Sequence, residues 1–385
     1  MDIPFIDLAA QQSRIYDRIE ENIKNVLSHG RYIMGPEVGE LEDRLASFVG
    51  VDFAIGCSSG TDALLMALMA YDVGPGDAVF TTPFTFVATA EVISLLGATP
   101  VFVDIEPDTF NMDPALLARA LDALERGDPS AYPLPVGYDK LTPRGVIAVD
   151  LFGQCADYDR IMPFAKDKGL FVIEDAAQSL GAEYHGRKAG SLADCAATSF
   201  FPAKPLGAYG DGGMVFTGDA YLAEKLYSIR VHGKGSHKYD NVRLGLNGRL
   251  DTIQAAILLA KLEIFPDELE LRQGVAARYS GLLSESDLVK CPVVKPGLRS
   301  AWAQYSLVSE KRDAILDRLR SLGIPTAIYY PLPLHFQGAY RGLGYRNGDF
   351  PVSESTSEAI FSIPMHPYLD KEAQERIASI ILEDA

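Results

Sequence analysis

Lys204 lies in a stiff and apolar stretch, SFFPAKPLGAYGDGG, which covers residues 199–213. Pro202 and Pro205 flank the lysine, and a run of glycines follows. A lysine in apolar surroundings has a lowered pKa, so its neutral amine can attack a carbonyl group and form a Schiff base. Most lysines are exposed, so a surface lysine whose stem packs on Phe201 would also explain the stretch.

A carboxylate at a predicted strand end is the second candidate for chemistry. In FVIEDAAQSLGA an apolar run leads into Glu174 and Asp175, and alternation along a strand points these two side chains to opposite faces. Burial of Asp175 is costly unless the carboxylate meets a cation or several donors. A helix cap would satisfy it, and so would a cationic atom of a ligand.

Two further motifs follow predicted strands. In SSGTDA, Gly60 and Thr61 open a helix, where backbone N–H groups and a hydroxyl can bind an anion, although a plain capped turn has the same sequence. The motif is neither a dinucleotide fingerprint nor a Walker loop. In PFTFVATAE, Phe84 and Phe86 could stack on a flat ring, although a core position is the commoner role of a single phenylalanine.

These parts together match the needs of one cofactor, pyridoxal phosphate. Lys204 would form the Schiff base, and Asp175 would pair with the pyridinium nitrogen so that the ring stays protonated and withdraws electrons. The turn at Gly60 and Thr61 would hold the phosphate. The combination therefore favours a pyridoxal phosphate enzyme.

The elements that must position these residues follow an alternating pattern. Apolar runs predict strands at 53–59, 78–83, 99–105, 145–153 and 170–177, with helical patterns between them and Asp113 as a helix cap. Such alternation is typical of an α/β fold with a mostly parallel sheet covered by helices, in which ligands bind beyond the carboxyl ends of the strands.

The sequence also predicts a division into domains. A large cofactor-binding domain is expected over 1–248, with an N-terminal helical arm that includes a helix over 13–28. A long linking helix is expected over 249–275, interrupted near Pro266, and a smaller α+β domain over 276–385. The Pro-rich, aperiodic stretch 127–144 is predicted to be a surface insertion.

Composition excludes several classes of function. The chain has 385 residues and a net charge of −17, which disfavours nonspecific binding to nucleic acid or to an anionic membrane. The four cysteines form no CxxC pair, so neither a disulfide framework nor a metal site is expected. No run of about 18 apolar residues occurs, so no signal peptide or membrane span is predicted and a cytoplasmic location is expected.

The chain resembles the DegT/DnrJ/EryC1/StrS sugar aminotransferases, which are fold-type I pyridoxal phosphate enzymes. The resemblance runs from FIDLAAQQ through SSGTDAL, FTFVATAE, EDAAQSLGA, SFFPAKPLGAYGDGG and GLNGRLDTIQAAIL to SIPMHPYL. It implies that Lys204 carries the cofactor and that Asp175 holds its pyridinium. It further implies that Gln178 binds the phenolic oxygen, and that Phe86 and Ala177 contact the two faces of the ring. Gly60, Thr61 and Ser199 would bind the phosphate. Asn247 would reach the phosphate of the neighbouring subunit. A homodimer with a shared active site is therefore expected.

The resemblance also implies a substrate class, with L-glutamate as amino donor and a nucleotide-linked keto-sugar as acceptor. The loop over 230–249 holds five basic residues against one acid, and the leading candidates for a substrate carboxylate are Arg243 and then Arg249. The motifs are most similar to those of transaminases for UDP-2-acetamido-2-deoxy-3-oxo-glucuronate, which serve bacterial surface polysaccharides such as O-antigen. Tyr329 stands where relatives often have histidine, and Tyr330 and His335 are further pocket candidates; a packed loop position would equally explain His335.

Three alternatives compete with this interpretation. The acceptor could be another 3-keto- or 4-keto-sugar nucleotide. The protein could be a non-catalytic regulator or sensor of pyridoxal phosphate, which the intact Lys204, Asp175 and Gln178 disfavour. A sugar dehydratase of the same family would have histidine at position 204, so that alternative is disfavoured as well.

Overall fold

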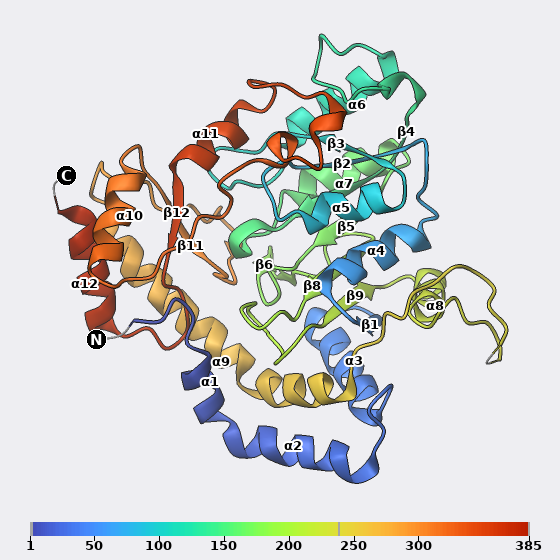
Figure 1. Ribbon diagram of the computed structural model, residues 1–385, viewed down its shortest axis with the longest axis horizontal. Coiled ribbons are helices and arrows are strands. Elements are labelled where there is room, and N and C mark those ends of the chain that lie inside the picture. The colour runs from blue at the N-terminus through green and yellow to red at the C-terminus, as the bar shows by residue number, and fades with distance from the viewer. Residues whose placement is uncertain (1–2, 238, 384–385) are drawn as a thin grey trace.

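The computed structural model describes residues 3–237 and 239–383 of the chain (Figure 1). Its helices are α1 (Leu8–Arg14), α2 (Tyr16–His29), α3 (Pro36–Val49), α4 (Gly60–Ala70), α5 (Ala88–Leu95), α6 (Pro114–Arg126), α7 (Tyr158–Asp167), α8 (Ala220–Ile229), α9 (Thr252–Leu283), α10 (Arg312–Ser321), α11 (Pro351–Ala359) and α12 (Lys371–Leu382). Its strands are β1 (Phe53–Cys57), β2 (Asp77–Thr81), β3 (Thr99–Phe102), β4 (Thr142–Val149), β5 (Phe171–Asp175), β6 (Glu183–Tyr184), β7 (Arg187–Lys188), β8 (Cys195–Ser199), β9 (Gly213–Thr217), β10 (Leu298–Arg299), β11 (Tyr305–Val308) and β12 (Ile360–Ile363).

A seven-stranded sheet forms the centre, in the order β1-β9-β8-β5-β4-β2-β3. β9 runs antiparallel to both β1 and β8, and the other neighbouring pairs are parallel. The mostly parallel sheet confirms the predicted α/β fold class. The predicted cap also forms, because the Asp113 carboxylate accepts from the N–H groups of Ala115 and Leu116 at the start of α6.

Helices cover both faces of this sheet, and the strands are apolar on both sides. Alternating residues of β5 enter different cores: Val172 packs with α3, α6, α7 and α9, whereas Ile173 packs with α4, α5 and α8. This two-sided burial explains why the strands read as continuous apolar runs rather than as polar–apolar alternation.

The parallel strands end at one edge of the sheet. β4 and β5 end in register, with Val149 opposite Asp175, and β8 continues alongside β5 with Ala197 opposite Asp175. β9 reverses direction between β8 and β1, so the carboxyl end of β1 lies at this edge too. The motifs that follow β1, β2, β5 and β8 are therefore brought to a common edge, as predicted for a ligand site in such a fold.

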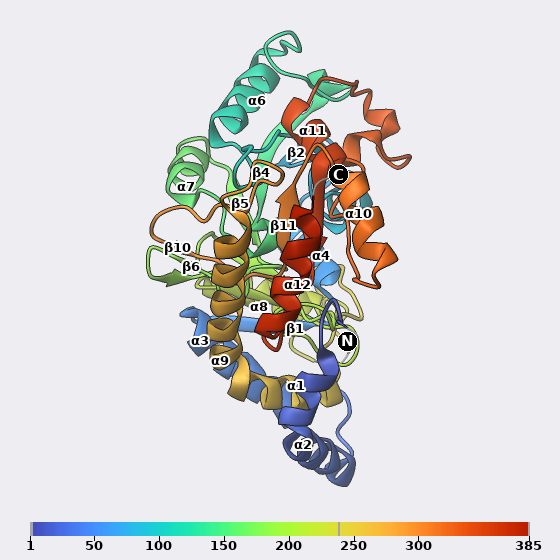
Figure 2. The same ribbon diagram turned by 90° about the vertical axis from the view of Figure 1, so that its left-hand side faces the viewer.

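The N-terminal helices and α9 support the sheet from one side. Figures 1 and 2 show α2 beside the first part of α9, and α12 beside its later part. The predicted interruption near Pro266 is wrong, because α9 is one continuous helix of 32 residues that includes this proline. Figure 1 shows a bend instead, which the proline explains because it removes one hydrogen bond and crowds the preceding turn.

A second core lies between the later part of α9 and the C-terminal elements. β11 and β12 pair antiparallel, and apolar residues of α10 and α12 pack with them, including Ile315, Leu319, Ile377 and Ile381. Residues from the same C-terminal region, such as Leu334 and Phe350, instead join the core of the main sheet. The predicted domain boundaries at 248 and 275 stay a prediction.

The stretch 127–144 is more firmly anchored than a surface insertion would require. Tyr132 is buried, and its hydroxyl accepts from the backbone N–H of Asp104 at 3.0 Å. Residues 142–144 belong to β4, where Thr142 pairs with Asp77. The start of this strand was not predicted because Pro143 argues against a strand. The proline lies beside a bulge, which is one of the few places where a strand accepts it.

Candidate active site

A tight turn at the carboxyl end of β1 forms the candidate phosphate cradle. Ser59 caps α4 by accepting from the N–H of Asp62, and Gly60 is the first helical residue. A Cβ added at Gly60 would lie 2.6 Å from the Cβ of Ser199, and one added at Gly213 would overlap the carbonyl of Ser59. The structure therefore brings Gly60 and Ser199 together, and only glycine permits the approach.

Asp175 lies at the end of β5 and is buried. The hydroxyl of Thr89 donates to Asp175 Oδ2 at 2.8 Å, and the N–H of Ala177 donates to Oδ1 at 3.2 Å. Burial raises the pKa of the Asp175 carboxyl, while these two donors and the nearby Lys204 charge oppose the rise. Thr89, at the start of α5, was not predicted, since its sequence gives no sign that it meets a strand 86 residues away.

Lys204 is half-buried, and its amine interacts electrostatically with the carboxylate of Asp175. Burial lowers the pKa of Lys204 below the ordinary value of 10.5, and the negative charge of Asp175 opposes the shift. The neutral amine is thus favoured more than in an exposed lysine, as the sequence argument expected for a nucleophile. Asp175 and Lys204, 29 positions apart in the chain, belong to one site.

α9 holds the loop that carries Lys204. The fully buried Lys261 donates from Nζ to the carbonyl of Gly207 at 2.7 Å, and its Nζ lies 4.3 Å from the ring centre of Tyr209. Gln254 accepts from the Tyr209 N–H at 2.9 Å. Sequence reasoning missed both α9 residues, because each lies within an otherwise apolar helical pattern.

Gln178 has a defined amide orientation. The Phe152 N–H donates to Gln178 Oε1 at 2.7 Å, and Gln178 Nε2 donates to the hydroxyl of Tyr330 at 3.1 Å. Because a backbone N–H can only donate, the amide oxygen must face Phe152 and the amino group must face Tyr330. The amino group keeps a second hydrogen for another acceptor.

The two phenylalanines after β2 have different environments. Phe84 is fully buried among aromatic side chains, so the core interpretation holds for it. Phe86 is 55% exposed, and its ring centre lies 6.5 Å from that of Tyr330. Phe86 is therefore the one of the two that has a face open to a flat ligand.

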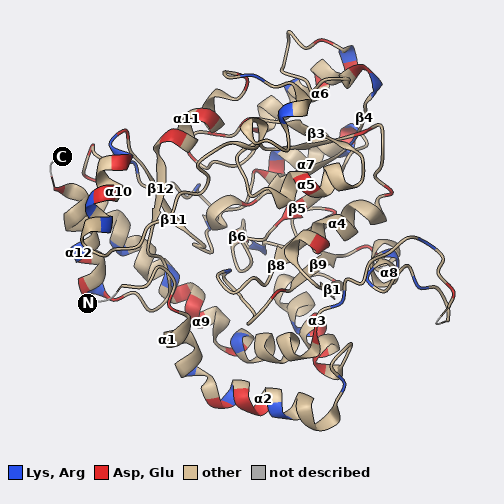
Figure 3. Ribbon diagram, in the orientation of Figure 1, with Lys and Arg blue, Asp and Glu red and all other residues tan. Residues whose placement is uncertain are grey.

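The basic residues of 230–249 do not act as one patch. Arg230 is buried, pairs with Glu42 and donates to the carbonyl of Gly56 at 3.0 Å. It therefore stabilises the protein interior. Figures 1 and 3 show the rest as a loop that extends beyond α8 and carries basic residues. Arg243 is half-buried and Asn247 is exposed, and Arg249 donates to the Asn247 side chain. Lys238, counted among the five, lies outside the described residues.

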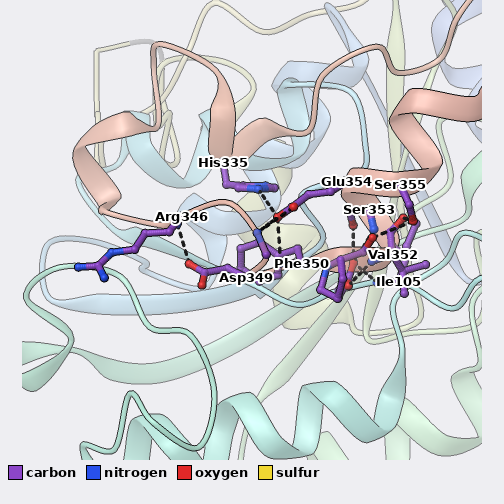
Figure 4. Close-up of polar contacts among 12 residues, drawn as sticks. Ile105, His335, Arg346, Asp349, Phe350, Val352, Ser353, Glu354 and Ser355 are labelled. Carbon is purple, nitrogen blue, oxygen red and sulfur yellow. Dashed lines mark hydrogen bonds and ion pairs between the residues drawn. The ribbon is translucent and has the colours of Figure 1, made fainter.

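His335 is a packed residue rather than an open pocket residue. Figure 4 shows its ring facing Glu354, to which Nε2 lies at 3.2 Å, and its side chain is fully buried. Burial lowers the pKa of His335, which favours the neutral ring. The ring packs 4.9 Å from that of Phe350, so the structure favours the packed loop interpretation of this histidine.

The described residues fit pyridoxal phosphate. The cradle around Gly60 is so close that a methyl group would fill it, Asp175 is a buried carboxylate without a bonded cation, and Lys204 has a depressed pKa. In the described part of the chain, no three His, Cys, Asp or Glu side chains are grouped to hold a metal ion. Nor is any helix between residues 3 and 383, position 238 aside, long and apolar enough to cross a membrane.

Comparison with known proteins identifies the family. The sequence profile of the DegT/DnrJ/EryC1/StrS aminotransferase family matches residues 13–382. This chain belongs to that family. It is thus an enzyme of a nucleotide-sugar aminotransferase family that uses pyridoxal phosphate, which confirms the predicted family, enzyme class and cofactor.

Three curated relatives match along nearly the whole chain. A UDP-2-acetamido-2-deoxy-3-oxo-D-glucuronate aminotransferase of Pseudomonas aeruginosa is 48% identical and covers 96% of each chain. A protein of Geobacillus stearothermophilus described as a pleiotropic regulatory protein is 43% identical, covering 100% of this chain and 98% of the relative. A UDP-N-acetyl-3-dehydro-α-D-glucosamine 3-aminotransferase of Acidithiobacillus ferrooxidans is 39% identical, covering 98% and 97%.

Two solved structures show the same fold. A DegT/DnrJ/EryC1/StrS aminotransferase from Brucella abortus superposes with a TM-score of 0.93 at 50% identity, covering 98% of each chain. The ntda protein of Bacillus subtilis, with the cofactor PMP bound, superposes with a TM-score of 0.87 at 27% identity, covering 99% of this chain and 84% of that one.

Proposed function

We propose that this protein transfers the amino group of L-glutamate to UDP-2-acetamido-2-deoxy-3-oxo-D-glucuronate. The observation that carries the proposal is the 48% identity to an aminotransferase for that sugar, over 96% of both chains. The Acidithiobacillus relative, named for a UDP-sugar with a 3-dehydro position, supports amination at C3. The product would feed the synthesis of a bacterial surface polysaccharide in the cytoplasm.

The described residues would divide the work as follows. Pyridoxal phosphate, when bound, supplies an aldehyde for amines and a ring that withdraws electrons from the attached carbon. Lys204 binds the cofactor and moves the proton at the reacting carbon of the substrate, for which its depressed pKa is suited. Asp175 would present its negative charge to the ring nitrogen, and Gln178 Nε2 would donate to the phenolic oxygen.

The remaining predicted ligands hold and shield the cofactor. The N–H groups and hydroxyls of Gly60, Thr61 and Ser199 would bind the phosphate at the start of α4. Phe86 would contact one face of the cofactor ring and Ala177 the other. Asn247 would reach the phosphate held by a second subunit, so the active protein would be a homodimer with shared sites.

Arg243 would bind the carboxylate that distinguishes a uronate from other sugars, and Arg249 and Tyr330 are further candidates for substrate binding. Arg243→Ala should raise KM for the keto-uronate about tenfold or more, because a hydrogen-bonded ion pair is lost. Retention of the cofactor should be unchanged. Lys234→Ala, on the other arm of the same loop, is the matched control. Equal KM values in the two variants would remove Arg243 from the pocket.

A direct assay distinguishes the candidate acceptors. The purified protein with pyridoxal phosphate and L-glutamate is mixed with the 3-keto-uronate, with a 3-keto-glucosamine nucleotide or with a 4-keto-6-deoxy-sugar nucleotide, and aminated products are identified by mass. Turnover of the uronate above the others is expected. Exclusive turnover of a 4-keto compound would replace the substrate assignment by the alternative.

The same preparation tests the regulator alternative, which the name of the Geobacillus relative makes worth testing. L-glutamate should shift the visible absorbance of the bound cofactor, and Lys204→Ala should abolish covalent attachment after borohydride reduction. A protein that binds pyridoxal phosphate but shows no shift with any amino donor would be a sensor rather than a transaminase.

A further inference from the structure

Phe152 has a backbone conformation that bulky residues rarely adopt. It follows β4 at the carboxyl edge of the sheet with φ 59° and ψ 5°. Outliers of this kind persist only where the surroundings hold them, and they gather at functional sites. Here Asn111 holds both ends of the turn, since its side chain accepts from the Leu151 N–H and donates to the Gln154 carbonyl, each at 2.9 Å.

The next residue, Gly153, presses against the C-terminal part of the chain. It has φ 107°, and an added Cβ would lie 2.7 Å from the backbone nitrogen of Trp302. The Ala301 N–H donates to the Gly153 carbonyl at 2.8 Å. Trp302 itself has φ 50°, and Arg272 of α9 donates to its carbonyl at 2.9 Å. Two unfavourable backbone conformations therefore meet and support each other.

This turn points one group at the candidate active site, the Phe152 N–H, which donates to Gln178 Oε1 at 2.7 Å. A glutamine amide can rotate by half a turn with little change in shape, and only its hydrogen-bond partners decide which end is the donor. Tyr330, the partner on the other side, is a hydroxyl that can donate or accept. Phe152 is thus the partner that makes Nε2, rather than the oxygen, the end available to a ligand.

We infer that Phe152 is a positioning residue for Gln178, and that the contact of Gly153 with residues 300–303 sets the direction of its N–H. The inference rests on the proposed function, because it takes Gln178 as a donor to the phenolic oxygen of the cofactor. Two groups from the region after α9 thereby bear on Gln178: the segment 300–303 through Phe152, and Tyr330 directly. The position of the region after α9 relative to the sheet therefore affects the orientation of the Gln178 amide.

Two isomeric side chains test the inference at Phe152. Phe152→Ile introduces a residue branched at Cβ, which opposes a positive φ. Phe152→Leu introduces an isomeric side chain that has no branch at Cβ. The readout is the pH at which the visible absorbance of the bound cofactor changes. A donor to the phenolic oxygen favours its deprotonated form, so loss of that donor raises the midpoint.

The isoleucine variant should raise this midpoint by about one pH unit, which is about a tenfold change in the proton equilibrium, and should release the cofactor faster. The leucine variant should keep the natural midpoint. Equal midpoints in the natural protein and in both variants would overturn the inference, and so would equal shifts in both variants, because packing rather than backbone conformation would then be responsible.

A second pair decides the matter if the isoleucine variant does not fold. Gly153→Ala forces a methyl group against Trp302, whereas Gly186→Ala has a comparable positive φ of 81° and open space around the new methyl. Only the former should raise the midpoint; an unchanged midpoint in folded Gly153→Ala would overturn the inference. Failure of the natural protein to bind pyridoxal phosphate would instead refute the proposed function.

Discussion

The hydroxyl of Thr89 offers the sharpest test of the electrostatics around Asp175. Thr89 is 1% exposed and Asp175 is 5% exposed, so neither side chain can replace a lost hydrogen bond with water. An ionised carboxylate only accepts, so Thr89 must donate to Asp175 and accept in turn from Thr85, whose hydroxyl lies 3.0 Å away. Thr89→Val removes this donor while it leaves the shape of the side chain nearly unchanged.

The size of the effect follows from the kind of bond. A hydrogen bond to a charged group contributes about 1.5–3 kcal/mol, whereas one between neutral groups contributes about 0.5–1.5 kcal/mol. Thr217→Val is the matched control, because Thr217 is 2% exposed and donates at 3.0 Å to the neutral carbonyl of Asp194. The midpoints of these ranges differ by about 1.25 kcal/mol, which corresponds to about an eightfold difference in equilibrium constant between the two variants.

Two measurements test this reasoning. Urea unfolding of the cofactor-free protein should show a larger loss of stability in Thr89→Val than in Thr217→Val. Absorbance titration should show weaker binding of pyridoxal phosphate in Thr89→Val alone, because the missing donor favours protonated Asp175, which cannot pair with a pyridinium. Equal stability losses together with unchanged cofactor affinity would refute the assigned role of Thr89.

Three further predictions follow from other contacts. Asp175→Asn should lower the pKa of the Lys204 amine further, because it removes the charge that opposes the effect of burial; pH-dependent amine labelling of the cofactor-free protein measures this. Arg230→Met should cost about 3–5 kcal/mol at pH 8 by leaving Glu42 buried and unpaired, and less at pH 5, because protonation then neutralises a carboxyl whose pKa burial already raises. Gly213→Ala should weaken phosphate binding by displacing the cradle, as a titration with pyridoxal phosphate would report.

Each of these predictions has a contrary outcome. An unchanged Lys204 pKa in the asparagine variant would show that Asp175 does not act on the amine. Lys168→Met breaks an exposed ion pair with Glu125 and is the control for Arg230→Met. If the two variants lost the same stability, the buried pair of Arg230 and Glu42 would contribute no more than an exposed one. Gly218→Ala, at the other end of β9 with open space around it, should bind the cofactor normally.

The fold and the central residues could be predicted because their signals are local. The continuous apolar runs before Asp175 and the glycines after Lys204 reflect constraints of one strand and one loop, which a reader of the sequence can recognise. The partners of these residues are a different matter. Thr89, Lys261 and Phe152 lie at least 26 positions from the residues or loops that they hold, and nothing in their own segments records the contact.

Charge in the sequence was an incomplete guide to the substrate loop. A run of basic residues predicts an anion site by composition, but composition cannot tell a side chain that faces outward from one that faces a buried carboxylate. Arg230 opens the run and lies inside, paired with Glu42, whereas Arg243 is half-buried and forms no such pair with any residue that the structure describes. The partner of each charged side chain must therefore be known before a run of basic residues can be assigned to an anion site.

α9 is connected by hydrogen bonds to the supports of both Lys204 and Gln178. Gln178 is held on one side by Phe152, whose turn leans on Trp302, and on the other by Tyr330. Trp302 and Tyr330 both follow α9 in the chain, and α9 also holds the Lys204 loop through Lys261. A displacement of α9 would disturb the Lys204 loop and the support of Gln178 together, because Lys261 holds the former and Arg272 holds Trp302 next to the latter. Variants at Arg272, in the later part of α9, should therefore alter the visible spectrum of the bound cofactor.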